Sequence, residues 1–154
     1  MDLSDLINPE SINTAFSAKN KKHALQELSA SASLLTDIPE RDIFDTLLQR
    51  ERLGSTGVGA GIAIPHGKIA GLDRIIGLFA RLETPIDFEA VDGEPVDLVF
   101  LLLAPESAGA DHLKALARIS RFLRAPSAVE GLRAASSSEA VYEILTEAEK
   151  EHAA

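Results

Sequence analysis

The 154-residue sequence contains no cysteine, which excludes disulfides, thiolate metal ligands and a cysteine nucleophile and is typical of proteins in a reducing cytoplasm. Basic residues are also scarce: 15 Lys and Arg against 24 Asp and Glu give a net charge of −9, which disfavours binding to nucleic-acid phosphates. The longest apolar run, residues 98–104, is far shorter than the roughly 18 residues that span a bilayer. The opening MDLSDLINPE lacks the basic and apolar segments of a secretory signal. We therefore expect a cytoplasmic protein without nucleic-acid partners or membrane insertion.

The composition that is present is that of an ordinary globular protein, with 45% hydrophobic and 25% charged residues. A chain of this length fits one domain and buries roughly 70% of the surface that its unfolded form exposes. No internal repeat, low-complexity segment or linker divides the sequence. We therefore predict one domain with a frayed C-terminal tail.

Apolar residues recur at helical spacing in several segments. After Asn20, a predicted N-cap, the recurring residues are Ala24, Leu25, Leu28, Ala32 and Leu35. Pro39 suits the first turn of a second helix, which Gly54 ends and whose apolar stripe is Ile43, Phe44, Leu47 and Leu48. Residues 110–124 predict an amphipathic helix that stops at Pro126, because one face carries, at helical intervals, Leu113, Leu116, Ala117, Ile119, Ser120 and Leu123. Two shorter helices are predicted at 128–134 and 138–148.

Four segments predict strands: residues 11–18, 62–64, 75–82 and 96–103. The last is so uniformly apolar that we expect burial on both faces, and therefore helices on both sides of the sheet. Asp92-Gly93 predicts a tight turn between the last two strands. Phe79, Phe100 and Phe122 are predicted core residues. The expected fold class is α/β, a single three-layer α/β/α domain with a mixed β-sheet flanked by helices.

Several kinds of site are disfavoured by spacing. GAGIAIPHGK ends in Gly-Lys, but five residues separate Gly61 from Gly67, and Ile69 stands where a P-loop needs Ser or Thr. A dinucleotide fingerprint would need glycine at position 62, which is Ile. The four histidines are scattered without a His-x-x-x-His pair, and no G-x-S-x-G elbow occurs. We therefore expect no metal and no cofactor.

His66 lies between Pro65 and Gly67, behind four glycines within residues 54–61. The simplest interpretation is a turn histidine whose ring is satisfied by hydrogen bonds. The setting favours a ligand role, because glycines offer N–H groups to an anion and a preceding proline limits the direction of the ring. A neutral imidazole, with an ordinary pKa of about 6.5, is a nucleophile that can accept a phosphoryl group. Composition leaves open which nitrogen reacts.

Two further side chains are candidates for assisting His66. His112 lies near the start of its helix and shares a face with Leu116, Ile119 and Leu123. It is either a partly buried structural histidine or a donor to a phosphoryl group near the positive helix end. Arg50, at the end of its helix, could clamp a phosphoryl group with its guanidinium. The neighbouring Arg52 has a similar position, and spacing does not choose between the two arginines.

Three blocks occur in order: RERLGSTGVGAGIAIPHGK, ETPIDFEAVDGEPVDLVFLLLAP and HLKALARISRFL. Together they resemble the type-2 enzyme IIA domain of the bacterial phosphoenolpyruvate-dependent phosphotransferase system, the mannitol/fructose class. The resemblance covers residues 6–148 and leaves residues 149–154 as the frayed tail. KKHALQELSA, LLQRERLGSTGVG and the absence of an attached IIB or IIC module resemble the nitrogen-regulatory enzyme IIA more than a sugar-specific one.

The resemblance implies that His66 is the phosphoacceptor, through its Nε2 atom. It implies that Arg50 and His112, sixteen residues before and forty-six after it, are the site partners, which selects Arg50 over Arg52. Further contacts are expected from Ser55, Thr56 and Gly67.

The implied activity is that of a phosphoryl carrier rather than a turnover enzyme. An HPr-like phosphocarrier (NPr), charged from phosphoenolpyruvate by an enzyme I homologue, would supply the phosphoryl group without a metal or cofactor. The expected output is regulatory, through targets such as sensor kinases and potassium transporters that affect nitrogen, potassium and carbon metabolism. Two alternatives stay open: a sugar-specific IIA component that passes the phosphoryl group to a IIB domain, and a binding module that is never phosphorylated, in which His66 is structural.

Overall fold

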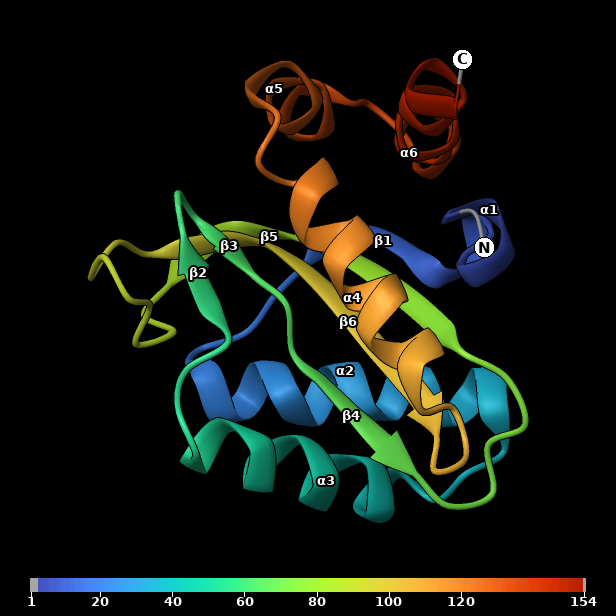
Figure 1. The fold of residues 1–154 in the computed structure, drawn as a ribbon. Helices are drawn as coiled ribbons and strands as arrows, with labels where there is room; N and C mark the ends of the chain where they lie inside the picture. Colours follow the sequence, from blue (N-terminus) through green and yellow to red (C-terminus); the bar gives the residue numbers. More distant parts are fainter. Residues whose placement is uncertain (1–2, 154) are drawn as a thin grey trace.

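The computed structural model describes residues 3–153, with side chains described through Thr146. Within this part of the chain, a mixed sheet lies between two layers of helices (Figure 1), which confirms the predicted three-layer α/β/α fold. The predicted tail, residues 149–154, falls outside the residues whose side chains are described.

The sheet is organised around one long central strand, β6 (Val96–Pro105). β5 (Ile76–Ile86) pairs with β6 antiparallel, and β1 (Ile12–Phe16) pairs with β5 parallel. On the other side of β6, β3 (Ile62–Ala63) and β4 (His66–Ile69) follow one another along it, both parallel to it. β2 (Gly57–Gly59) pairs antiparallel with β3 at the edge. The chain between β3 and β4 is therefore interrupted only at residues 64–65.

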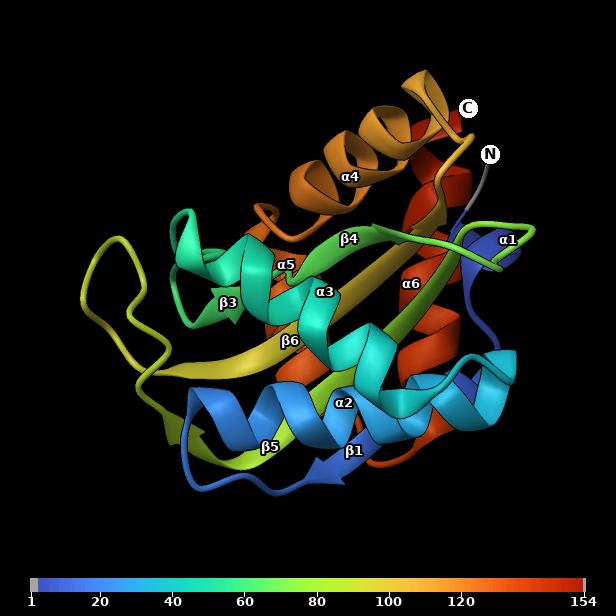
Figure 2. The same ribbon diagram turned by 90° about the horizontal axis from the view of Figure 1, so that it is seen from below.

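Helices cover both faces of this sheet. One face packs on α2 (Lys21–Thr36) and α3 (Glu40–Arg52), which lie in front in Figure 2. The other face packs on α1 (Leu3–Leu6), the 3-10 turn η1 (Pro9–Ser11), α4 (Ala110–Phe122), α5 (Pro126–Ala134) and α6 (Ser138–Ala153). In Figure 1, α4 crosses in front of the sheet, and α5 and α6 lie above it.

Strand β6 is buried on both faces, as its apolar sequence predicts. Alternate residues enter the two cores: Val99, Leu101 and Leu103 face α2 and α3, whereas Leu98, Phe100 and Leu102 face α4 to α6. Fully burying each such side chain stabilises the fold by about 1.5–3 kcal/mol. β6 is therefore the rigid base for the strands that pair with it.

Local sequence signals set several boundaries. The Asn20 side chain accepts a hydrogen bond from the His23 amide at 2.9 Å, which confirms the predicted N-cap of α2. Pro126 is at the first turn of α5, so this helix begins two residues earlier than predicted. The Gly93 amide donates to the Ala90 carbonyl at 2.9 Å, which closes the predicted turn, with its central residues one position earlier than expected.

Two helix faces differ from the sequence prediction. Leu35 and Leu113 were expected in apolar stripes, but they are 38% and 67% exposed, and Ala117 is also exposed. The buried face of α4 is instead made by His112, Ala115, Ile119 and Phe122. The physical reason is the rotation of α4 about its axis: the side of the helix that carries His112 and the small Ala115 packs on the sheet, and Leu113 points outward.

Candidate functional site

His66 is the first residue of strand β4, not a turn residue as the simplest interpretation supposed. Parallel pairing with Leu102 of β6 fixes its backbone. A Cβ on the adjacent Gly67 would lie 2.7 Å from Cγ2 of Thr46 in α3. Because successive residues of a strand point to opposite faces, His66 points away from α3 and toward α4. Its ring there meets the ring of His112, with centroids 5.8 Å apart in an edge-to-face arrangement at 62°.

Hydrogen bonds to the two ring nitrogens of His66 specify its tautomer. Nδ1 lies 2.8 Å from the carbonyl oxygen of Ile64, two residues earlier. A carbonyl only accepts, so Nδ1 carries the proton and donates. In the neutral ring Nε2 then holds a lone pair, and the Nε–H of Arg50 donates to it at 3.4 Å. The backbone therefore leaves Nε2 as the ring nitrogen that carries the lone pair.

Arg50 reaches this nitrogen from the last turn of α3. Its Nη1 donates to the carbonyl of Gly54 at 2.9 Å, so one end of the guanidinium is held by the loop and the other faces His66. Arg52 lines the same hollow, but only Arg50 is hydrogen-bonded to His66. Of the two arginines that spacing leaves open, Arg50 is therefore the one that the structure places at hydrogen-bond distance from the His66 ring.

The electrostatic setting keeps His66 neutral. Burial lowers the pKa of His66 below its ordinary 6.5, and the Arg50 charge lowers it further. The hydrogen bond to Ile64 and the carboxylate of Glu51 raise this pKa without reversing the shift. At pH 7 the ring is therefore mainly uncharged, and its Nε2 lone pair accepts the hydrogen bond from Arg50.

His112 lies in the first turn of α4 and is 7% exposed. Burial lowers the pKa of His112, and the nearby His66 and Lys68 lower it further. Its Nε2 is buried and has no hydrogen-bond partner among the described residues. An unsatisfied buried polar atom costs about 1–3 kcal/mol, and a polar ligand beside His66 would relieve this cost.

The three side chains open onto a shallow hollow of about 630 Å³, lined by Thr46, Gln49, Arg50, Arg52, Leu53, His66, Gly67, Lys68 and His112. Among the described residues, no carboxylate lines this hollow, although the whole chain carries a net charge of −9. Sequence reasoning missed Lys68, which lies two residues after His66 on the same face of β4. Strand alternation would have placed it there, had β4 been recognised. The hollow is thus locally basic and suited to an anionic group.

Two of the expected site contacts lie elsewhere. Ser55 Oγ donates to the Phe88 carbonyl at 2.8 Å, and the buried Thr56 hydroxyl is hydrogen-bonded to Glu51. Neither residue lines the hollow of His66, so their hydroxyls do not face its ring. Gly67 does line it, and its lack of a side chain is what lets α3 approach β4.

The glycine-rich segment before His66, residues 54–61, has a structural role, whereas the sequence suggested that its glycines bind an anion. A Cβ on Gly57 would lie 2.9 Å from atoms of Ala90, and Gly59 and Gly61 have φ angles of +104° and +80°. These glycines form the β2–β3 hairpin and do not line the hollow. Only Gly54 contributes, through the carbonyl that holds Arg50.

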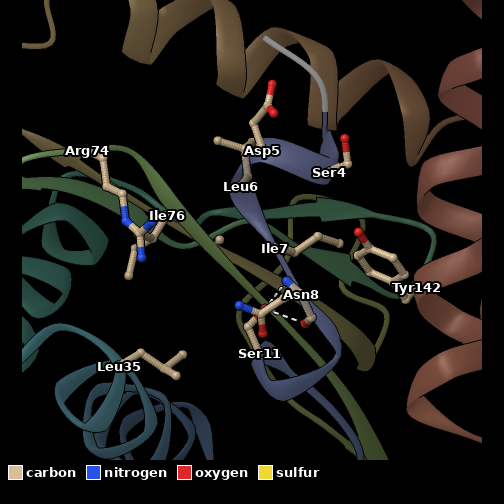
Figure 3. A pocket seen from close by; sticks show the side chains of 11 residues that line it. Ser4, Asp5, Leu6, Ile7, Asn8, Ser11, Leu35, Arg74, Ile76 and Tyr142 are labelled. Carbon is tan, nitrogen blue, oxygen red and sulfur yellow. Dashed lines mark hydrogen bonds between the residues drawn. The ribbon is translucent and has the colours of Figure 1, made fainter.

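A second hollow, of about 250 Å³, lies near α1 and η1 (Figure 3). Its Asn8 and Ser11 are bonded to one another in a capping box, which uses their polar groups locally. In the described part of the chain, no three His, Asp or Glu side chains group closely enough for a metal. Among the helices of residues 3–153, none combines the length and apolar character that crossing a membrane requires.

Comparison with known proteins gives one family and several full-length relatives. Residues 5–148 match the family described as phosphoenolpyruvate-dependent sugar phosphotransferase system, EIIA 2. A nitrogen regulatory protein of Bradyrhizobium diazoefficiens is 59% identical over 145 residues, covering 94% of this chain and 95% of the relative. The crystal structure of nitrogen regulatory protein IIA-Ntr from Neisseria meningitidis has a TM-score of 0.89 and 37% identity, covering 94% of this chain and 99% of that one.

The same fold occurs in a solved complex of enzyme IIAMTL with phosphorylated enzyme IIBMTL from Escherichia coli. The TM-score is 0.77 at 20% identity, covering 90% of this chain and 96% of that chain.

Proposed function

The chain belongs to the phosphoenolpyruvate-dependent sugar phosphotransferase system EIIA 2 family, and from this premise we propose that it accepts a phosphoryl group on Nε2 of His66 and acts through its phosphorylation state. Its relatives named nitrogen regulatory protein confirm the predicted resemblance to the nitrogen-regulatory group. The observation that carries the proposal is the pair of bonds on the His66 ring: Nδ1 to the Ile64 carbonyl and Nε2 to Arg50.

The transfer step exchanges one N–P bond for another. The Nε2 lone pair attacks phosphorus on the phosphohistidine of the donor, a new N–P bond forms, and the old bond breaks with its electron pair returning to the donor ring. Positive charge develops on the His66 ring as the bond forms. The Ile64 carbonyl stabilises that charge through the Nδ1–H, which stays in place throughout.

Arg50 has two successive roles in this scheme. Before transfer, its Nε–H donates a hydrogen bond to the lone pair on Nε2 of His66. Once phosphorus occupies Nε2, the guanidinium is free to donate to a phosphoryl oxygen. His112, whose buried Nε2 has no partner among the described residues, and Lys68 line the same hollow and would contact the other oxygens. The transferred group carries about two negative charges, which suits a pocket lined by cations and no carboxylate.

The donor in this proposal is an HPr-like carrier (NPr), charged by an enzyme I homologue, and the setting is the cytoplasm. The added charge beside His66 would change which regulatory targets bind, sensor kinases and potassium transporters among them. A second candidate function, transfer onward to a IIB domain, is favoured by the fold shared with the enzyme IIAMTL complex. A radiolabel chase separates the two, because rapid loss of label to an added IIB protein and sugar indicates transport.

The direct test is incubation with phosphoenolpyruvate, enzyme I and an HPr-like protein, followed by intact mass measurement. We expect a gain of one acid-labile phosphoryl group that is absent from His66→Ala. If the wild-type protein gains no phosphoryl group, or if His66→Ala still gains one, the proposed function is wrong. If the wild-type protein is not phosphorylated and His66→Ala binds its partners as the wild type does, the protein is instead a binding module in which His66 is structural.

A further inference from the structure

A buried carboxylate, that of Glu51, stands beside Arg50 in the sequence and is not among the described residues that line the hollow of His66. The side chain of Glu51 is 3% exposed. Consecutive helical residues point about 100° apart, so Arg50 reaches β4 while Glu51 turns toward α2. Burying a carboxylate is costly unless it is paired and hydrogen-bonded. The contacts of Glu51 therefore need an explanation.

Glu51 joins three segments of the chain. Its carboxylate oxygens accept from the Thr56 amide at 3.3 and 3.2 Å, and Oε1 also accepts from the Thr56 hydroxyl. Lys21, in the first turn of α2, pairs with Oε2 at 2.7 Å. The Lys21 ammonium also lies 5.0 Å from the centroid of the Phe88 ring. The loop after α3 is thus anchored to α2 through one carboxylate.

That loop holds Arg50. Between Glu51 and Thr56 the chain folds back, and the Gly54 amide donates to the Glu51 carbonyl at 3.1 Å. The Gly54 carbonyl then accepts from Nη1 of Arg50 at 2.9 Å, and Nε of the same guanidinium faces Nε2 of His66. Fixing Thr56 therefore fixes the carbonyl that orients Arg50.

We propose that Glu51, with Lys21 and Thr56, is a positioning network for phosphoryl transfer: it aims Arg50 at the reacting nitrogen and does not touch the phosphoryl group. The inference rests on the proposed function. A buried ion pair is weak as a source of stability, because apolar replacements of similar volume are often as stable. In this protein the ion pair of Glu51 and Lys21 instead holds residues 53–56, and thereby the Arg50 guanidinium, in one conformation.

The test measures single-turnover phosphoryl transfer from excess HPr-like carrier to the full-length protein, where kcat is the rate constant at saturating carrier and KM the carrier concentration that gives half of it. Glu51→Gln removes the charge at nearly constant shape, and Thr56→Val removes the hydroxyl at nearly constant volume. A misplacement of about 1 Å can cost roughly 100-fold in rate. We expect both variants to lower kcat about 10-fold or more, with KM for the carrier within about 2-fold of wild type. We expect Thr56→Ser, which keeps the hydroxyl, to retain the wild-type kcat.

Double variants separate positioning from a general loss of structure. In an Arg50→Ala background, Glu51→Gln should reduce kcat no further, because the residue through which it acts is gone. In a His112→Gln background it should keep its full effect. The inference is overturned if folded Glu51→Gln transfers within about 2-fold of wild type, or if its effect persists without Arg50. If Glu51→Gln does not fold, the test is made with Thr56→Val and Thr56→Ser: the inference is overturned if Thr56→Val transfers within about 2-fold of wild type, or if its effect persists without Arg50. Failure of the wild-type protein to accept phosphoryl would instead count against the proposed function.

Discussion

Replacing Gly67 by alanine should push helix α3 away from strand β4 and separate Arg50 from His66. The new Cβ would lie 2.7 Å from Cγ2 of Thr46, roughly 1 Å inside the 3.5–4.0 Å at which carbon atoms pack. Thr46 cannot rotate freely, because its hydroxyl donates to the Asp42 carbonyl at 2.9 Å. We therefore expect a loss of about 1–3 kcal/mol in the free energy of unfolding.

The functional effect of this substitution should exceed its effect on stability. Nε of Arg50 is already 3.4 Å from Nε2 of His66, so a small further displacement breaks this hydrogen bond. Arg50 lies one helical turn after Thr46 and moves with it. We expect the rate of phosphoryl acceptance to fall about 10-fold or more, measured under conditions where Gly67→Ala is fully folded.

A second substitution provides the control. Thr46→Ser removes only Cγ2 and keeps the hydroxyl, so alone it should change stability by no more than about 0.5 kcal/mol. In the double variant it should restore most of the stability and rate lost in Gly67→Ala, with a coupling energy of about 0.5–3 kcal/mol. Urea unfolding followed by circular dichroism gives the energies. A Gly67→Ala protein as stable as wild type, or no recovery in the double variant, would refute the proposed packing constraint.

Three further predictions concern pH, docking and fold stability. Because the neutral ring is the nucleophile and the pKa of His66 is lowered below 6.5, the acceptance rate should be constant above pH 7 and decline only below pH 6.5; a decline centred above pH 6.5 would contradict this. Leu53 lines the hollow and is 85% exposed, so Leu53→Ser should raise KM for the carrier about 10-fold, whereas Leu34→Ser, at an 86% exposed position of α2, should leave it unchanged. Arg81 donates to three carbonyls at the end of α5, at 2.9, 3.4 and 2.7 Å, so Arg81→Met should cost about 2 kcal/mol or more in urea unfolding without slowing transfer; unchanged stability would show that these bonds are dispensable.

The parts of the fold that sequence predicts are those where one local signal dominates. The uninterrupted apolar run of β6 requires burial on both faces, and Asn20 is a strong N-cap in front of an apolar repeat. Strand β4 could not be predicted in the same way. Its residues after Pro65 include glycine and lysine without apolar alternation, and its pairing with β6 is a tertiary interaction.

The candidate site was predictable as residue types but not as geometry. Proline and glycine around His66 indicated a fixed histidine, yet the nearby glycines serve a hairpin instead of a ligand. Arg50 and Arg52 are equivalent in spacing, and only the packing of α3 against β4 separates them. The Nδ1–Ile64 hydrogen bond, which leaves the lone pair on Nε2, depends on a backbone conformation that no local pattern encodes.

The most direct measurement is nuclear magnetic resonance of protein labelled with ¹⁵N in its histidines, before and after phosphorylation. At neutral pH the His66 ring should show a protonated Nδ1 and a lone pair on Nε2, as the Ile64 carbonyl requires. After incubation with the phosphoryl donor, phosphorus should be coupled to Nε2 while Nδ1 keeps its proton. A proton on Nε2 in the resting protein, or phosphorus on Nδ1, would contradict the account.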